Sequence, residues 1–186
     1  KNASLGEMIS KLSNKGIAIP DGFATSTDAF RFFLEENKIN EALSKILQGL
    51  DTASFENLNE IGAAARDLLT KATIPDSLRA EIIAGYKKLC DENGGVVEVA
   101  VRSSASAEDL PTASFAGQHD SFLNVRGEED VVKAVQKCYI SLYNNRAIKY
   151  RIDNGFEHVH VALSAGVQLM VRADLSCAGV AFTLEP

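Results

Sequence analysis

The spacing of the apolar residues changes at the glycine pair Gly94-Gly95, and this change constrains the fold more than any other feature of the sequence. Before the pair, apolar residues recur every three or four positions, which is the period of an amphipathic helix. After the pair, the valine-rich run VVEVAVRS alternates apolar and polar residues, as a strand with two different faces does. Two glycines suit the end of a helix, since glycine adopts a left-handed conformation without steric cost. The sequence therefore predicts a helical first half followed by a half that contains a sheet.

Five helices are predicted before the glycine pair. Ser26 or Thr27 has the side chain of a helix N-cap, and Pro75 suits a helix start because its missing N–H has no partner in a first turn. Between the first two helices, KGIAIPDGFATS is an extended stretch interrupted by Pro20 and Gly22. The predicted helices cover 3–14, the segment after Ser26-Thr27, 39–50, 55–73 and 75–92.

The second half mixes strands and helices. Strands are predicted at VVEVAVRS and DSFLNV, and helices at 128–143 and 146–152. AGVQLMVRAD and CAGVAFTLE then form an antiparallel hairpin with its turn at 174–176. Helices followed by such a sheet are typical of an α+β fold. We expect a helical part over 1–95 and an α/β part over 96–186, in a chain cut before the rest of its domain.

Composition excludes several classes of partner. The chain has 186 residues and a net charge of −6, so it carries no basic surface for nucleic acid or for an anionic membrane. No apolar run approaches the roughly 18 residues that a membrane-spanning helix needs. Cys90, Cys138 and Cys177 lie far apart, without the spacing of a metal site or a redox pair. These features predict a cytoplasmic protein with reduced, buried thiols.

One stretch departs from both periodicities. Arg102 ends the first predicted strand, and small and hydroxylated residues follow it through SSASAEDLPTASFAGQHD. A guanidinium matches phosphate oxygens with a fork of donors, and Gly117 allows the backbone to approach a ligand closely. Such a loop suits a phosphate. The alternative is a surface connection in which Arg102 pairs with Glu108 or Asp109. Because these two acids are adjacent, they do not face each other as a catalytic pair would.

Three further candidates carry weaker signals. Lys1 precedes a helix, where a lysine can contact a bound phosphate, although a solvated terminal lysine has the same pattern. Gln168 is an amide within an apolar strand and needs a partner, which a ligand could supply, or it faces outward. His158 and His160 would share one face of a strand, and without a third metal ligand nearby we expect both at the surface. The sequence contains no Walker A loop, GxGxxG fingerprint or nucleophile elbow.

Five blocks span nearly the whole chain, namely KNASLGEM, PDGFATSTDAF, VAVRSSASAEDLPTASFAGQHDSFLNV, NNRAIKYR and VALSAGVQLMVRADLSCAGVAFT. In this order they resemble the N-terminal ATP-binding domain of the phosphoenolpyruvate synthases (pyruvate, water dikinases). The resemblance implies an ATP-grasp fold, of which this chain is the N-terminal subdomain with its helices followed by a mostly antiparallel sheet. It also implies a parent enzyme that phosphorylates pyruvate, using ATP and water, and releases AMP and phosphate.

The resemblance further implies site residues and partners. Lys1 and Arg102 correspond to phosphate-contacting cations, Gly117 and Ser121 to contacts of the nucleotide loop, and Gln168 to a further ATP contact. The acidic ligands of Mg²⁺ are expected beyond residue 186. In the family, ATP phosphorylates a histidine on a swivelling domain of the same chain, and pyruvate binds a third domain. No catalytic residue is therefore expected in these residues, and the isolated chain should be inactive.

Three substitutions depart from the family pattern. His119 stands where glutamine is expected, Leu169 where a basic residue is common, and Ser106 replaces a usual threonine. None of these positions carries a proposed phosphate cation. Rifampicin phosphotransferases and pyruvate phosphate dikinases share the domain, so a domain of either type is an alternative. A module that binds nucleotide without transferring phosphate is a third.

Overall fold

The computed structural model describes residues 2–105, 109–110, 113–114, 120–175 and 177–179. Seven α-helices lie in these ranges, together with three short 3-10 turns at Ser13–Lys15, His158–His160 and Ala173–Leu175. The helices are α1 (Asn2–Leu12), α2 (Thr27–Glu36), α3 (Asn40–Gln48), α4 (Leu58–Lys71), α5 (Asp76–Glu92), α6 (Glu128–Ser141) and α7 (Asn145–Asp153). The strands are β1 (Gly22–Ala24), β2 (Glu98–Ala105), β3 (Asp109–Leu110), β4 (Ala113–Ser114), β5 (Ser121–Arg126) and β6 (Leu163–Leu169).

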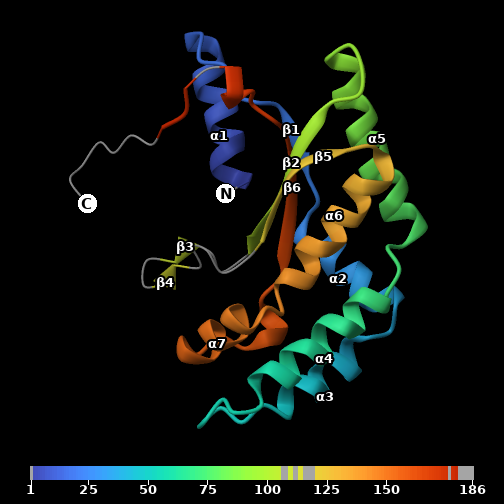
Figure 1. Ribbon diagram of the computed structural model, residues 1–186, viewed down its shortest axis with the longest axis vertical. Helices are drawn as coiled ribbons and strands as arrows, with labels where there is room; N and C mark the ends of the chain where they lie inside the picture. The colour runs from blue at the N-terminus through green and yellow to red at the C-terminus, as the bar shows by residue number, and fades with distance from the viewer. Residues whose placement is uncertain (1, 106–108, 111–112, 115–119, 176, 180–186) are drawn as a thin grey trace, which may run out of the picture.

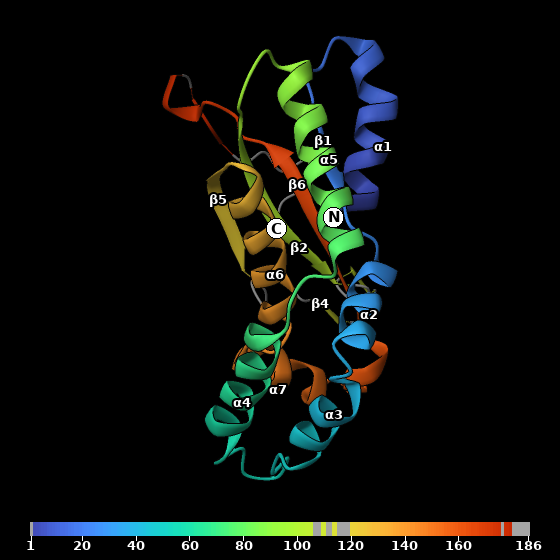
Figure 2. The same ribbon diagram turned by 90° about the vertical axis from the view of Figure 1, so that its right-hand side faces the viewer.

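Four strands form an antiparallel sheet in the order β1-β6-β2-β5. Figure 1 shows α1 on one side of this sheet and α5 with α6 on the other, and Figure 2 shows α3, α4 and α7 gathered beyond one end of it. The α+β fold with a mostly antiparallel sheet, predicted from the order of elements, is confirmed. The sheet draws on both halves of the chain, because β1 comes from the helical first half and pairs with β6.

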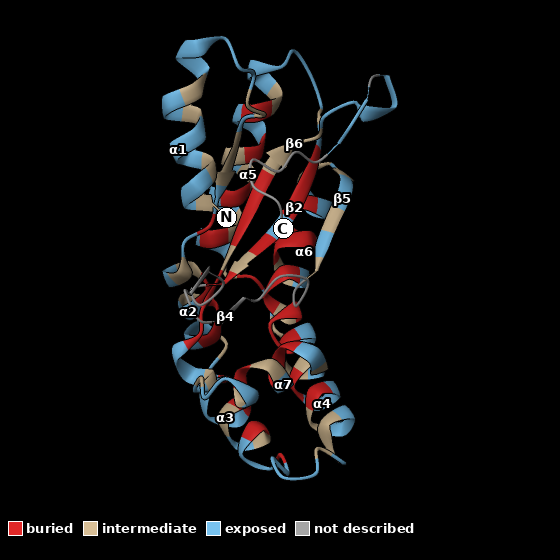
Figure 3. Cartoon of the chain, turned by 90° about the vertical axis from the view of Figure 1, so that its left-hand side faces the viewer, coloured by how far each residue is buried: buried red, intermediate tan, exposed pale blue. Residues whose placement is uncertain are grey.

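The two faces of the sheet differ in burial. Side chains alternate along a strand, so Val99 and Val101 of β2 lie under α6 and are fully buried. Leu163, Ala165 and Val167 of β6 are buried on the same face. The opposite face carries Arg102 and faces α1, which has no buried residue. Figure 3 shows this contrast, with buried strands behind a largely exposed α1. The core therefore lies between the sheet and the α5–α6 layer.

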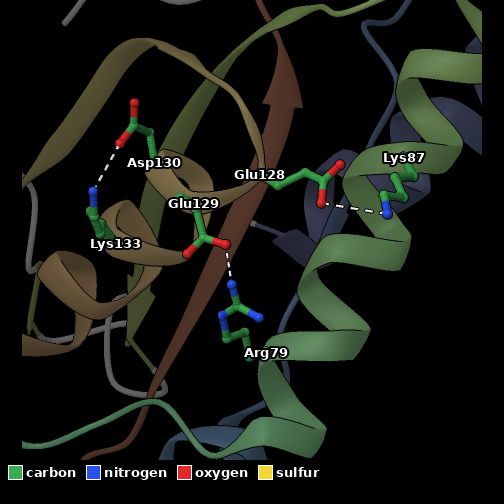
Figure 4. A network of polar contacts seen from close by, with 6 residues as sticks. All are labelled: Arg79, Lys87, Glu128, Glu129, Asp130 and Lys133. Carbon is green, nitrogen blue, oxygen red and sulfur yellow. Dashed lines mark hydrogen bonds and ion pairs between the residues drawn. The ribbon is translucent and has the colours of Figure 1, made fainter.

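Polar contacts join α5 to α6 around this core. The hydroxyl of Tyr86 donates to the Val97 carbonyl at 2.7 Å and accepts from the Gly127 amide at 2.9 Å. Figure 4 shows two ion pairs between the helices, Arg79–Glu129 and Lys87–Glu128, and a third within α6. All of these charges are exposed, so each pair contributes no more than about 1 kcal/mol. Apolar burial and the Tyr86 bonds hold the layer together.

The predicted helices in 1–95 and 128–152 are confirmed, with ends that differ by a few residues. Ser26 is the N-cap of α2, and its hydroxyl accepts from the Ala29 amide at 3.1 Å. The short pair β3–β4 was not predicted. The strand predicted over 177–185 lies mostly outside the described residues, and 177–179 have no regular structure. Of the three cysteines, all free, only Cys138 is buried, and Cys177 is exposed. The prediction of three buried thiols is therefore wrong.

The prediction for the histidines is half wrong. His160 is exposed, but His158 lies half-buried in a 3-10 turn rather than on a strand. Its Nδ1 accepts from Nε of Arg151 at 2.8 Å, and this arginine is fully buried. Arg151 also donates to the Leu142 carbonyl at 2.6 Å, and its guanidinium lies 5.6 Å from the centre of the Tyr143 ring. A chain reversal at Gly155 brings the turn back onto α7 and so places His158 against the arginine.

This contact makes the stability of the chain depend on pH. Burial, and then the charge of Arg151, lower the pKa of His158 from 6.5 to about 4. As the pH falls, the unfolded chain therefore takes up a proton at His158 at a higher pH than the folded chain does. The resulting stability is present above pH 6.5 and is lost as the pH falls towards 4. Because the ring is only half-buried, we expect a loss of about 1 kcal/mol rather than the full value of the shift.

Urea unfolding at pH 7 and pH 4.5 measures this loss. His158→Gln should reduce the loss between the two pH values, because glutamine does not titrate. His160→Gln is the matched control and should leave the loss unchanged, since this ring is exposed and its ion pair is with the exposed Glu157. Equal acid losses in the wild type and His158→Gln would contradict the prediction.

Candidate functional site

A cavity of about 320 Å³ lies between α1 and the exposed face of the sheet. One wall is α1, and the floor is formed by β1, β2 and β6. The lining residues are Asn2, Ser4, Leu5, Gly6, Met8, Ile9, Gly22, Phe23, Ala24, Arg102, Gly166, Val167 and Gln168. Most of this lining is apolar or backbone. Arg102 is the one charged residue among the described residues of the lining, so the cavity suits a ligand with an apolar part and an anionic part.

Arg102 is held by the middle of the sheet. It lies on β2, directly opposite Gly166 of β6 and Ser121 of β5. Its side chain is exposed, and within the described part of the chain no carboxylate comes within ion-pair distance of it. The structure therefore presents a permanent positive charge on a rigid strand without a counter-charge from the described residues. Such a group suits a phosphate, because the guanidinium fork matches phosphate oxygens.

Small residues surround the arginine and expose backbone. Gly166 lies beside it on β6, and Ala24 lies beside Gly166 on β1. In the next row of the sheet, Gln168 of β6 lies between Gly22 and Ala100. The side chains on the cavity floor around Arg102 are therefore small, so a ligand can approach both the guanidinium and the backbone of the strands.

Gln168 extends from the same face as Arg102. It is half-buried, and its Nε2 donates to the Pro20 carbonyl at 3.1 Å. This bond gives the amide one protein partner and orients it along the rim of the cavity. The side chain is thus neither a purely outward-facing strand residue nor one whose only possible partner is a ligand.

The segment after the predicted loop is anchored at Asp120. The Asp120 carboxylate accepts from Arg146 at 2.7 Å and from Asn144 at 3.1 Å. Its backbone carbonyl accepts from the hydroxyl of Ser103 at 3.1 Å. Both ends of the segment between β2 and β5 are therefore tied to the fold. The sequence pattern did not reveal this anchor, although Asn144 and Arg146 belong to the quoted block NNRAIKYR.

The structure brings two of the predicted site residues together. Arg102 and Gln168 both line the cavity, whereas Ser121 is exposed on β5, beside Arg102 but outside the lining. Lys1 and Gly117 lie outside the described residues, as do the side chains of Glu108 and Asp109. Asn2, the neighbour of Lys1 in the chain, lines the cavity and was missed by the sequence analysis. Its only signal was its place in the block KNASLGEM.

Among the described residues, no group of three or more His, Cys, Asp or Glu side chains could hold a metal ion. No helix within the described ranges is long and apolar enough to cross a membrane.

The sequence was compared with known proteins. Residues 1–186 match the family described as "Pyruvate phosphate dikinase, AMP/ATP-binding domain". The chain is 50% identical over 186 residues to a phosphoenolpyruvate synthase of Neisseria meningitidis and 51% identical over 185 residues to one of Deinococcus radiodurans. It is 46% identical over 187 residues to the phosphoenolpyruvate synthase of Escherichia coli. Each alignment covers 100% of this chain and 23% of the relative.

Proposed function

Because the chain belongs to the pyruvate phosphate dikinase AMP/ATP-binding domain family, we propose that it binds the phosphates of ATP in the cavity between α1 and the sheet. The observation that carries this proposal is Arg102, an exposed cation without an ion-pair partner among the described residues, on the floor of that cavity. The apolar wall of α1 offers a surface for the base or the ribose. The fold thus supplies both parts of a nucleotide site.

The residues of the chain have distinct roles in this proposal. Arg102 binds phosphate oxygens and neutralises part of their charge, and β2 fixes its position. Gln168 and Ser121 supply hydrogen bonds on either side of it. On the strength of the resemblance, we also propose Lys1 and Gly117 as contacts of the nucleotide. The division of the chain into a helical part and an α/β part at residue 95 is likewise a proposal. On the strength of the same resemblance, we propose that the acidic ligands of Mg²⁺ lie beyond residue 186.

We further propose that the longer protein is a cytoplasmic phosphoenolpyruvate synthase. Such an enzyme converts ATP, pyruvate and water to phosphoenolpyruvate, AMP and phosphate through a phosphohistidine on a separate domain, while pyruvate binds a third domain. Phosphoryl transfer depends on positioning and charge neutralisation, and this chain provides only part of both. The isolated chain is therefore expected to bind ATP without turning it over. A rifampicin phosphotransferase would instead modify the antibiotic, so assays of the full-length protein with pyruvate and with rifampicin separate the two enzymes.

Titration calorimetry of ATP with Mg²⁺ tests the site. Arg102→Ala should weaken ATP binding by about tenfold to a hundredfold, since hydrogen bonds to charged groups contribute about 1.5–3 kcal/mol. Arg126→Ala is the matched control. Arg126 is exposed on the same sheet, but it lies opposite Glu98 in the strand register and outside the cavity lining, so its removal should leave the affinity unchanged. ATP affinity that Arg102→Ala leaves unchanged would defeat the assignment of the cavity.

A further inference from the structure

The first described residue of α1 is joined to the sheet by a chain of hydrogen bonds. Nδ2 of Asn2 donates to Oγ of Ser164 at 2.7 Å, and this hydroxyl donates to the Thr25 carbonyl. Oγ1 of Thr25 accepts from the Ala165 amide at 3.0 Å and from the Tyr139 hydroxyl at 3.2 Å. The chain of bonds therefore runs from the helix beside the cavity, across β6, to the buried core under α6.

The available protons determine which group donates and which accepts in each of these hydrogen bonds. Ser164 has one hydroxyl proton, which goes to the Thr25 carbonyl, so its oxygen accepts from Asn2. The amide of Asn2 is thereby oriented with its nitrogen towards Ser164. At the far end, burial raises the pKa of Tyr139 to about 12, so its phenol stays protonated and donates to Thr25. The hydrogen bond from Asn2 to Ser164 is therefore connected, through Thr25, to the buried hydroxyl of Tyr139.

Little else holds α1 on the sheet. The helix has no buried residue, and only Asn2, Leu5, Ile9 and Leu12 are half-buried. The other side-chain hydrogen bonds of residues 2–12 lie within the helix itself, from Ser10 and from Lys11 to Glu7. Within the described part of the chain, the bond from Asn2 to Ser164 is thus the one side-chain hydrogen bond between α1 and the sheet. The place of the first turn of α1 depends on it.

The same amide packs beside the proposed phosphate cation. Oδ1 of Asn2 lies over Gly166, and a Cβ added to this glycine would come within 2.5 Å of that oxygen. Gly166 is the direct neighbour of Arg102 across the sheet. The absence of a side chain at Gly166 therefore lets Asn2 reach the sheet next to the guanidinium.

We propose that Asn2 is a positioning residue for nucleotide binding. Through Ser164 it fixes the first turn of α1, which lines the cavity that Arg102 also lines. The inference rests on the proposed function, because it concerns the phosphates that this site would bind. It assigns to Asn2 no contact with the nucleotide.

Ser164→Ala in the full-length protein that contains this chain is the sharpest test. Ser164 does not line the cavity, so the variant removes the partner of Asn2 without changing any lining residue. We expect Ser164→Ala and Asn2→Ala each to weaken ATP binding about tenfold, and the double variant to add little, since both remove one bond. Ser164→Thr keeps the hydroxyl and should restore most of the affinity. Ser10→Ala, whose hydroxyl bonds only within α1, should bind ATP as the wild type does.

The affinities are measured by titration well below the unfolding temperature, with thermal unfolding of each variant recorded without nucleotide. A positioning role is supported if ATP binding weakens in variants that remain fully folded at the titration temperature. It is overturned if Ser164→Ala and Asn2→Ala lower only the unfolding temperature and bind ATP as tightly as Ser10→Ala. If the wild type itself binds no ATP, the proposed function fails instead, so the two failures are distinguishable.

Discussion

Replacing Arg151 by alanine is expected to destabilise the chain by about 4 kcal/mol, within the range for large buried side chains. Arg151 is fully buried and fills space under α7. Its loss leaves the Leu142 carbonyl and His158 Nδ1 without their donor, and it removes the contact with the Tyr143 ring. Unfolding in urea, monitored by circular dichroism, measures the change.

Arg151→Met separates packing from polar effects. Methionine keeps most of the volume, and it also removes a buried cation whose Nη2 has no hydrogen-bond partner among the described residues. Burial lowers the pKa of Arg151 to about 10, a sign that the charged form is costly in this place. We therefore expect Arg151→Met to destabilise the chain by only about 1–2 kcal/mol. A loss as large as that of the alanine variant would show that the hydrogen bonds dominate over packing.

Gly22→Ala is expected to cost about 3 kcal/mol and to abolish ATP binding at the proposed site. A Cβ at this position would lie 2.3 Å from the Val167 carbonyl oxygen and 2.9 Å from Cα of Gln168. Both are backbone atoms of β6, which is held between β1 and β2 and cannot yield. Strand β1 has three residues and must therefore detach, taking one edge of the cavity floor with it.

Gly6→Ala is the matched control for this substitution. Gly6 lies in α1, and an added Cβ meets no atom within 4 Å. Alanine is favoured over glycine in a helix, so this variant should be as stable as the wild type or slightly more stable. Thermal unfolding of both variants gives the comparison, and ATP titration of Gly22→Ala against the wild type measures the loss of binding. Wild-type stability in Gly22→Ala would mean that β1 accommodates the methyl group, contrary to the geometry.

Much of the fold could be predicted from local patterns. Helical spacing and caps located the helices, and the cap at Ser26 is an example. Alternation located β2, and β5 and β6 were also predicted as strands. The pairing of β1 with β6 could not be predicted, because register between strands so distant in sequence depends on the complete fold. Arg151 shows a second limit, since an arginine in a short helix gives no sign that the turn at His158 will bury it.

The candidate site divides in a similar way. Arg102 and Gln168 could be proposed because their residue types are unusual for their places on strands, and the structure brings both to one cavity. Asn2, Gly22 and Gly166 could not be identified, because their importance comes from contacts across the sheet rather than from their own patterns. Asp120 likewise meets Arg146 only after α6 has packed. The type of a residue can indicate that it binds a charged ligand. The residues that surround it in the site are known only from the tertiary structure.

The strand order β1-β6-β2-β5 has a consequence for the biosynthesis of the protein. A ribosome makes the chain from its N-terminus, so β1 is complete long before Leu163–Leu169 exists to pair with it. Strands β2 and β5 can pair earlier, since only a short segment separates them, and closing a short loop costs less entropy. The nascent chain thus carries α1 and β1 without a partner strand until β6 is translated. The surface on which the cavity is built is among the last parts of this chain to form.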